Sequence, residues 1–267
     1  MNWIFLNKNN CDEYIEMFAH GSGAQPTCLE TWHYEDSTDP LVLRGIMKHK
    51  IIKRCWADQR DFYYMDTGYL GNRPSATNPN GWKFWHRIVP NNLQHDTVIE
   101  RPADRWQRLG IKMRPEQKHS RNILLVAPDE KPCSFYGITL DQWMQTTIET
   151  LKQHTDRPIL VRERPASRLA RKTQKAEDWL MDVHAVVTYN SSAATESIIA
   201  GVPVFVTAPC NAARPVSNLD LSKIETPWFP TDDERHAWAC HLAYGQFHTT
   251  ELMSGLAAKI LQETHNV

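Results

Sequence analysis

The chain has 267 residues, of which 41% are hydrophobic and 23% charged, a balance typical of soluble globular enzymes. This length suffices for two α/β lobes or for one large domain. The six cysteines are irregularly spaced with no C-x-x-C pair, which argues against a disulfide framework or a zinc site. The N-terminus lacks a signal-peptide pattern, and no run of about 18 apolar residues follows. We therefore predict a reduced, cytoplasmic protein that does not enter the membrane.

Charge is distributed unevenly, although the net charge is only -1. Residues 40–121 contain 16 Lys or Arg against 7 Asp or Glu, whereas the segments on either side are acidic. A basic middle segment can indicate an anionic partner such as nucleic acid. It can equally be a solvated face, so the charge pattern leaves both interpretations open.

The first half of the chain alternates irregularly between strand and helix patterns. Residues 3–6 predict a strand and residues 11–21 a helix, while 40–46 and 61–71 predict strands that run into loops. The segment "NRPSATNPNG" at 72–81 predicts a surface loop because it is rich in Pro, Asn and Gly.

Two further segments bear on the domain organisation. The aromatic and basic "WKFWHR" occupies residues 82–87, directly after the predicted loop. The polar, proline-containing "RPEQKHSR" at 114–121 is the predicted hinge between two lobes. We accordingly expect an N-terminal lobe over residues 1–118, which binds the acceptor.

The second half alternates regularly between strands and helices. Strands are predicted at 122–128, 157–164, 185–189 and 202–207, with helices at 139–154, 175–182 and 192–201. Such alternation implies right-handed crossovers and a parallel, doubly wound sheet. Two helical patterns, at 231–244 and 249–263, complete the chain.

A cluster of polar residues follows the third of these strands. Asn190, Ser191 and Ser192 form a turn at the carboxyl end of a parallel strand, where such sheets bind ligands. Amides at a helix N-terminus favour anions, and Glu196, one turn later, can accept hydrogen bonds from sugar hydroxyls. The cluster fits a nucleotide diphosphate with an attached polyol. An ordinary serine N-cap with a surface glutamate is the structural alternative.

The segment "VVTYNSSAATESIIAGVPVFV" resembles the donor-binding segment of GT-B glycosyltransferases, particularly capsule-type and bacteriophage members. The resemblance covers roughly residues 120–260. It implies an α/β fold of two Rossmann-like lobes with a cleft between them, a nucleotide-sugar donor and no obligatory metal. It also implies that Asn190, Ser191, Ser192 and Glu196 contact the donor. The chain contains no D-x-D motif, which is the usual metal-binding motif of the GT-A alternative.

This resemblance supplies a division of the chain and a donor class. It implies a donor-binding lobe over residues 119–240 and a C-terminal helix over 241–267 that crosses back to the first lobe. We expect a UDP-sugar as substrate, transfer with inversion, and no tightly bound cofactor or metal. Oligomeric state is left open.

Two arginines at the end of the second predicted strand of this lobe are further donor candidates. Arg162 and Arg164 lie in "VRERP", and a guanidinium can pair with two phosphate oxygens at once. Because the strand runs into a loop at this point, only one of them should face the ligand, and Arg162 is preferred. A surface salt bridge is the alternative role.

The first lobe should provide the base that removes the acceptor proton. Asp66 follows an aromatic strand in "YYMDTGYLG" and is the first candidate. His20, at a predicted helix end before "GSG", is the second. A loop-stabilising role for Asp66 and a helix-capping role for His20 are the alternatives.

The acceptor is predicted from the basic segment and its aromatic residues. Lys83 and Arg87 could bind phosphates, while Trp82, Phe84, Trp85 and His86 could stack on bases. The segments "DTGYLG" and "WHRIVPNNLQ" also resemble bacteriophage glycosyltransferases that modify hydroxymethylated pyrimidines in DNA. This resemblance implies double-stranded DNA as acceptor, with the modified base flipped out of the duplex. The alternatives are an acceptor in surface polysaccharide synthesis and a non-catalytic nucleic-acid-binding protein.

Overall fold

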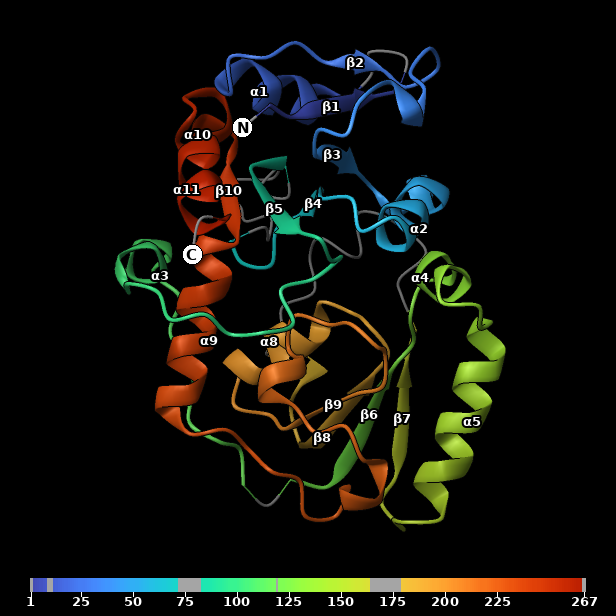
Figure 1. Cartoon of the computed structure of the whole chain (residues 1–267). Helices are drawn as coiled ribbons and strands as arrows, with labels where there is room; N and C mark the ends of the chain where they lie inside the picture. Colours follow the sequence, from blue (N-terminus) through green and yellow to red (C-terminus); the bar gives the residue numbers. More distant parts are fainter. Residues whose placement is uncertain (1, 9–11, 72–82, 119, 164–178, 266–267) are drawn as a thin grey trace. The chain divides into compact units, whose positions relative to one another are not determined.

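A computed structural model describes residues 2–8, 12–71, 83–118, 120–163 and 179–265. The chain forms two compact units, which are described separately. Unit 1 consists of Met1–Leu93 with Gly245–Val267, and unit 2 of Gln94–Tyr244. Each unit is a mixed α/β structure built on a sheet with parallel strands (Figure 1).

Unit 1 contains a six-stranded sheet in the order β10-β5-β4-β3-β1-β2. The strands β1, β2, β3 and β4 run parallel, whereas β5 pairs antiparallel with both β4 and β10. The strands span Ile4–Asn7 (β1), Thr27–Cys28 (β2), Leu41–Arg44 (β3), Phe62–Thr67 (β4), Trp85–Pro90 (β5) and Gln246–His248 (β10). The central β4 begins with four consecutive buried residues, as expected for a strand covered on both faces.

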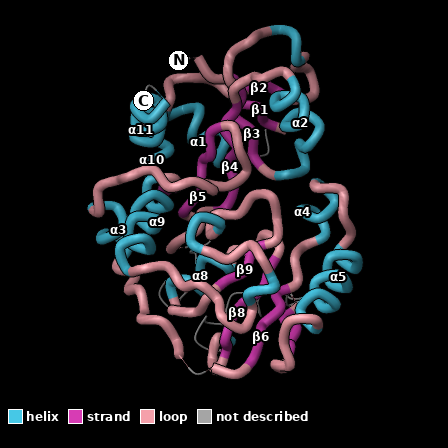
Figure 2. Tube along the Cα trace, turned by 60° about the horizontal axis from the view of Figure 1, so that its bottom comes forward, coloured by secondary structure: helices cyan, strands magenta, loops and turns pink. Residues whose placement is uncertain are grey.

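The helices of unit 1 cover both faces of this sheet. On one face, α1 (Glu13–Gly21), α10 (Thr249–Met253) and α11 (Leu256–His265) enclose an aromatic core with Trp3, Phe5, Phe18 and Phe247 (Figure 2). Helix α2 (His49–Ala57) buries Ile52 and Cys55, which do not belong to that core. Thus the C-terminal segment completes the fold of the N-terminal one.

Unit 2 contains a four-stranded parallel sheet in the order β7-β6-β8-β9. The strands span Asn122–Val126 (β6), Ile159–Arg162 (β7), Val183–Thr188 (β8) and Val204–Val206 (β9). The helices are α3 (Asp104–Leu109), α4 (Glu130–Phe135), α5 (Leu140–Lys152), α8 (Ala193–Ile199) and α9 (Asp232–Tyr244). Helices α4 and α5 share a core with Ile123, Val187 and Phe205, to which α8 contributes no residue. Right-handed crossovers accordingly place α8 on the opposite face of the sheet.

Most predicted strands and helices occur within a few residues of their expected positions. The strand β10 and its antiparallel pairing with β5 were not predicted, because Gln246–His248 is too short to show a periodic pattern. The C-terminal helical pattern is two helices, since Gly255 adopts φ +80° between them. The predicted loop 72–81 and the first half of the predicted helix 175–182 lie outside the described residues.

The predicted hinge at 114–121 is part of unit 2 in the structure. The amide of Arg114 donates to the carbonyl of Ile199 at 2.8 Å, and that of Gln117 to Gly201 at 2.7 Å. These bonds tie the polar segment to the end of α8, so it is not an interdomain linker. The boundary between units falls after residue 93 rather than 118, and the chain returns to unit 1 at residue 245 rather than 241.

Gly201 is essential to this packing, and we predict that Gly201→Ala destabilises unit 2. Its φ is +83°, and an added Cβ would lie 2.0 Å from the carbonyl oxygen of Pro115. The left-handed conformation alone costs about 1–2 kcal/mol for other residues, and the backbone clash adds to this cost. Gly137→Ala is the matched control, because Gly137 has φ +78° with no atom within 4 Å of the added Cβ. Urea denaturation should show a larger loss for Gly201→Ala, and equal losses would contradict the clash.

Candidate functional site

The carboxyl ends of the four parallel strands of unit 2 lie at one edge of its sheet. The polar turn Tyr189–Ser192 follows β8 at this edge and leads into α8, a helix of seven residues. The amide of Thr207, just beyond β9, donates to the carbonyl of Thr188 at 3.1 Å, and the amide of Ala208 to that of Tyr189 at 3.3 Å. The turn is therefore fixed between two strand ends, where parallel sheets bind ligands.

Only one of the three polar side chains in this turn is used by the fold. The hydroxyl oxygen of Ser191 accepts a hydrogen bond from the amide of Ala193 at 3.2 Å and thus holds the first turn of α8. Ser192 occupies the N-cap position without a capping hydrogen bond, and it is exposed. The side chains of Ser192 and half-buried Asn190 make no hydrogen bond to any described residue. These two polar groups are available to a ligand.

Glu196 lies one turn beyond Ser192, and its amide donates to the Ser192 carbonyl at 3.3 Å. Residues four apart lie on the same side of a helix, so Glu196 and Ser192 share one face of α8. Glu196 is half-buried, whereas its neighbours Thr195 and Ser197 are fully buried. The structure thus brings Asn190, Ser192 and Glu196 together in one local region, as the sequence predicts.

The two serines are expected to respond differently to substitution by alanine. Ser191→Ala removes a hydrogen bond to the backbone at the start of α8 and should lower the free energy of unfolding by about 0.5–1.5 kcal/mol. Ser192→Ala removes no internal hydrogen bond and should leave unfolding unchanged within about 0.5 kcal/mol. Chemical denaturation of both variants tests this difference. A destabilised Ser192 variant would show that this hydroxyl serves the fold.

Arg162 lies at the carboxyl end of β7, at the same edge of the sheet. Its guanidinium carbon lies 4.4 Å from the centre of the Trp179 ring, a cation–π distance. The side chain is therefore stacked on an aromatic ring. Arg164 lies outside the described residues.

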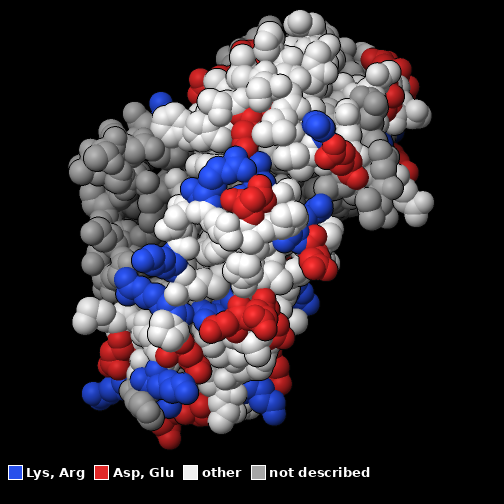
Figure 3. All heavy atoms as spheres, turned by 90° about the vertical axis from the view of Figure 1, so that its left-hand side faces the viewer, with Lys and Arg blue, Asp and Glu red and all other residues white. Residues whose placement is uncertain are grey.

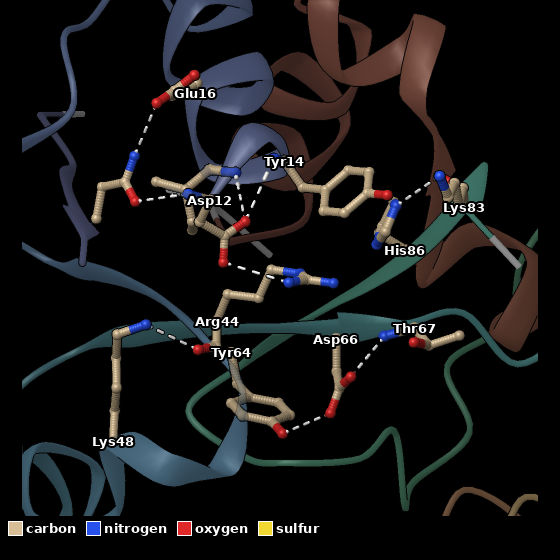
Figure 4. A network of polar contacts seen from close by, with 12 residues as sticks. Asp12, Tyr14, Glu16, Arg44, Lys48, Tyr64, Asp66, Thr67, Lys83 and His86 are labelled. Atoms are coloured by element: carbon tan, nitrogen blue, oxygen red, sulfur yellow. Dashed lines mark hydrogen bonds and ion pairs between the residues drawn. The ribbon is translucent and has the colours of Figure 1, made fainter. Parts of the chain in front are cut away.

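A second polar cluster lies at the corresponding edge of the sheet in unit 1 (Figure 4). The parallel strands β1, β3 and β4 end there with Asn7, Arg44 and Asp66–Thr67. Because β5 runs antiparallel, its first residues, including His86, reach the same edge. The topology consequently gathers polar side chains from four strands.

Asp66 is held by three groups in this cluster. Its carboxylate accepts hydrogen bonds from the Tyr64 hydroxyl at 2.8 Å and the Thr67 amide at 2.7 Å, and it pairs with Arg87 at 3.3 Å. Burial acts to raise the pKa of Asp66, but Arg87 and these two hydrogen bonds outweigh it and lower the pKa. The side chain remains 34% exposed, so a substrate hydroxyl can reach an ionised carboxylate.

Arg44 and Asp12 form the second ion pair of the cluster. Arg44 Nη1 lies 3.3 Å from Asp12 Oδ2, and the guanidinium carbon lies 4.6 Å from the centre of the Tyr14 ring. The other oxygen of Asp12 accepts from the amides of Tyr14 and Ile15, which caps α1. Asp12 is thereby fixed by the helix and in turn orients Arg44.

His86 also packs against Tyr14, with the ring centres 4.0 Å apart. Its Nε2 lies 3.0 Å from the Lys83 carbonyl, which accepts only, so Nε2 carries the proton and Nδ1 is bare. Burial lowers the pKa of His86 to about 4, and the residue is 1% exposed. His86 is therefore neutral at physiological pH.

The neutral, buried His86 predicts a loss of stability in acid. A histidine whose folded pKa is about 4, against a usual value of 6.5, favours unfolding as the pH falls below 6.5. At pH 5 the loss should be about 2 kcal/mol relative to pH 7. His86→Phe keeps the ring and should remove that part of the pH dependence in urea denaturation. His241 of unit 2 has the same lowered pKa, and His241→Phe is the comparison. An unchanged pH slope in His86→Phe would contradict the assignment.

The structure separates the two predicted bases. His20 lies in the last turn of α1, which follows β1 and runs back along the parallel strands, so it reaches the opposite edge of the sheet from Asp66. His20 is exposed there. Of the two candidates, only Asp66 belongs to the polar cluster.

The residues proposed to bind DNA have different environments. Arg87 is 13% exposed, pairs with Asp66 and donates to the Thr67 carbonyl at 2.6 Å. Its positive charge is therefore paired with a carboxylate within unit 1. Trp85 is half-buried, and its ring contacts that of His248 edge-on, with the ring centres 5.3 Å apart. Lys83 is exposed, and Trp82 lies outside the described residues. An internally paired Arg87 is not the exposed phosphate ligand that the sequence suggested.

Sequence reasoning did not identify Asp12 or Arg44 as site residues, and it predicted His86 to stack on bases, a role that its 1% exposure excludes. Arg44 had a usable signal, because it is a basic residue at the carboxyl end of a predicted strand, like Arg162. Asp12 had the signal of a helix N-cap only. Within the described ranges, no group of three or more His, Cys, Asp or Glu residues could hold a metal ion, and no helix is long and apolar enough to cross a membrane.

Comparison with known proteins found no matching family model and no matching curated protein. Solved structures similar to this chain include KpsC of Thermosulfurimonas dismutans, described as a β-Kdo 2,4-transferase. It has 12% sequence identity and a TM-score of 0.48, over 89% of this chain and 98% of that chain. The β-Kdo 2,7-transferase of the same organism's KpsC has 12% identity and a TM-score of 0.39, over 83% and 85% of the two chains. Similarity at this level does not assign an activity, and the function is argued from the residues of this chain.

Proposed function

We propose that this protein is a glycosyltransferase that moves a sugar from a nucleotide-sugar donor to a hydroxyl acceptor. The observation that carries the proposal is the turn after β8, where Asn190 and Ser192 present polar side chains that no described residue binds. Glu196 shares that face and can accept hydrogen bonds from ribose or sugar hydroxyls. The turn therefore offers donors for phosphate and an acceptor for a polyol, as a nucleotide-sugar requires.

In the proposed reaction, an acceptor hydroxyl attacks the anomeric carbon of the donor sugar. The new C–O bond forms as the bond from the anomeric carbon to the donor phosphate oxygen breaks, and the nucleotide departs with both electrons of that bond. Asp66 takes the hydroxyl proton. Its lowered pKa keeps it ionised at neutral pH, so it is ready to accept the proton as the attack develops.

We further propose a glycan acceptor, of the kind used in surface polysaccharide synthesis, in preference to DNA. The pairing of Arg87 with Asp66 removes one of the expected phosphate contacts. In Figure 3, the visible Lys and Arg side chains have Asp and Glu side chains beside them. A hydroxymethylated DNA acceptor is the second candidate, and exposed Lys83 is the observation in its favour.

The proposal is tested by binding and by product analysis. Isothermal titration of UDP-, GDP-, dTDP- and CMP-linked sugars should identify a donor that the protein binds and that a Ser192→Ala, Glu196→Ala double variant binds more weakly. Mass spectrometry then follows transfer of the sugar from that donor to oligosaccharides and, in parallel, to hydroxymethylated duplex DNA. Binding of no nucleotide-sugar by the wild-type protein would overturn the proposed function.

A salt series separates the two acceptor classes. Affinity for DNA must fall steeply as salt rises, because neutralised phosphates release counterions. Fluorescence anisotropy with labelled hydroxymethylated duplex should show no such salt-dependent binding if the acceptor is a neutral or small acidic glycan. Salt-dependent binding that is weakened by Lys83→Ala would favour DNA instead.

A further inference from the structure

The polar cluster of unit 1 contains more basic than acidic side chains. Asp12 pairs with Arg44 and Asp66 pairs with Arg87, which leaves Lys48 without an ion-pair partner among the described residues. The ammonium of Lys48 donates to the main-chain carbonyl of Arg44 at 2.8 Å, a neutral acceptor. After burial, the charge of Asp12 has the largest effect on the pKa of Lys48 and acts to raise it, while Arg44 and exposed Lys8 act to lower it and exposed Glu30 to raise it. Lys48 and the residues of the two ion pairs comprise three cations and two anions, and Glu16, which accepts from Asn7 at 3.1 Å, is exposed.

Lys48 is held in this position by the chain itself. Gly45, with φ +81°, turns the chain after β3, and the short 3-10 helix Ile46–Lys48 brings the lysine back over the strand end. The side chain is half-buried, and burial lowers the pKa of Lys48 below its usual value. A partly desolvated ammonium that hydrogen-bonds only a carbonyl gains free energy when an anion binds nearby.

Arg44 is oriented as a ligand contact beside this charge. Nη1 is occupied by Asp12 and the guanidinium lies over the Tyr14 ring, while Nε is buried without a hydrogen-bond partner among the described residues. The Nη2 of Arg44 also donates no hydrogen bond to any described residue. In Figure 4 the guanidinium is drawn between Asp12 and the Tyr64–Asp66 pair, and its charge acts to lower the pKa of Asp66.

We propose that this edge of unit 1 recognises an anionic group, a carboxylate or a phosphate, with Arg44 as the contacting residue and Lys48 as the excess positive charge. Planar guanidinium groups bind both anions through paired N–H donors. Beside Asp66, such a group would mark the acceptor as an acidic sugar or a sugar phosphate. That assignment to the acceptor rests on the proposed function, whereas the anion site rests on unit 1 alone.

The probes for this site are inorganic phosphate, glucuronate and, as a neutral control, glucose. Wild-type protein should bind phosphate or glucuronate in calorimetric titrations at constant ionic strength, and it should not bind glucose. Lys48→Met should weaken anion binding by about 3–10-fold, because it removes charge but no contact. Arg44→Met should weaken it by about 10-fold or more, because it removes the paired donors.

Matched variants separate recognition from folding. Lys50→Met removes an exposed lysine from the start of α2 and should bind the anions as wild type does. Arg44→Lys keeps the charge and the pairing with Asp12 but loses the planar donors, and it should bind more weakly than wild type. The site would be overturned if wild-type protein bound neither phosphate nor glucuronate. It would also be overturned if Lys48→Met and Arg44→Lys bound these anions with wild-type affinity. Donor binding at the turn after β8 is titrated separately, so failure of that site is distinguishable from failure of this one.

Discussion

Asp66→Asn should reduce turnover by about 10²–10⁴-fold, the usual loss when a general base is removed. The amide keeps the size of the side chain, and its one carbonyl oxygen can still accept from the Thr67 amide, but it cannot take a proton. Steady-state kinetics with the donor identified by calorimetry measures the loss. Donor affinity should be unchanged, because the proposed donor contacts lie in α8 and the turn before it.

Two further variants make this result specific. Asp58→Asn is the control, since Asp58 is a 48% exposed carboxylate that pairs with Arg54 in the same unit. Tyr64→Phe removes one hydrogen bond that lowers the pKa of Asp66, so this pKa should rise. A base must be unprotonated to act, so the acid limb of the pH–rate profile should move to higher pH in Tyr64→Phe. Wild-type turnover in Asp66→Asn would exclude Asp66 as the base.

Glu196→Ala should weaken nucleotide-sugar binding by about 10–150-fold, equivalent to about 1.5–3 kcal/mol for a charge-assisted hydrogen bond. Glu196 shares one face of α8 with exposed Ser192, one turn from the polar turn. Calorimetry with each nucleotide-sugar that binds the wild type measures the change. The helix should remain folded, because alanine has a high helix propensity.

Asp233→Ala is the control for this substitution. Asp233 is an exposed acidic residue in the first turn of α9, in the same unit as Glu196. It changes the net charge equally but lies outside the proposed site, so donor affinity should stay within about twofold of wild type. Unchanged affinity in Glu196→Ala would remove Glu196 from the site and leave Asn190 and Ser192 as its remaining contacts.

The parallel sheet of unit 2 could be predicted because its signals are local. Each strand is a short β-rich run, such as 122–126, and the intervening α5 begins with a Thr139–Gln142 capping box that is visible in the sequence. The polar turn at 189–192 was likewise identified, since the end of a parallel strand is a known ligand position. The separate roles of Ser191 and Ser192 could not be predicted, because a one-residue shift in the N-cap decides which hydroxyl bonds the backbone.

The domain boundary depended on contacts between distant residues. The polar composition of 114–121 resembles a linker, but the backbone of this segment bonds to residues 199 and 201. Backbone hydrogen bonds carry no side-chain signature, so composition could not show them. For the same reason β10 could not be predicted, because this short strand is defined by its backbone pairing with β5.

By itself, the sequence determined the strand–helix alternation of unit 2 and the positions of its polar turn, because hydrophobic periodicity and turn chemistry act over a few residues. Only the tertiary structure decided the cluster of unit 1. Asp12, Arg44, Asp66 and His86 are far apart in the chain, and they meet because β1, β3 and β4 run parallel while β5 runs antiparallel. Strand order and direction are set by long-range packing and hydrogen bonding. They therefore also determine which carboxylate lies beside an arginine and which lysine has no carboxylate as an ion-pair partner.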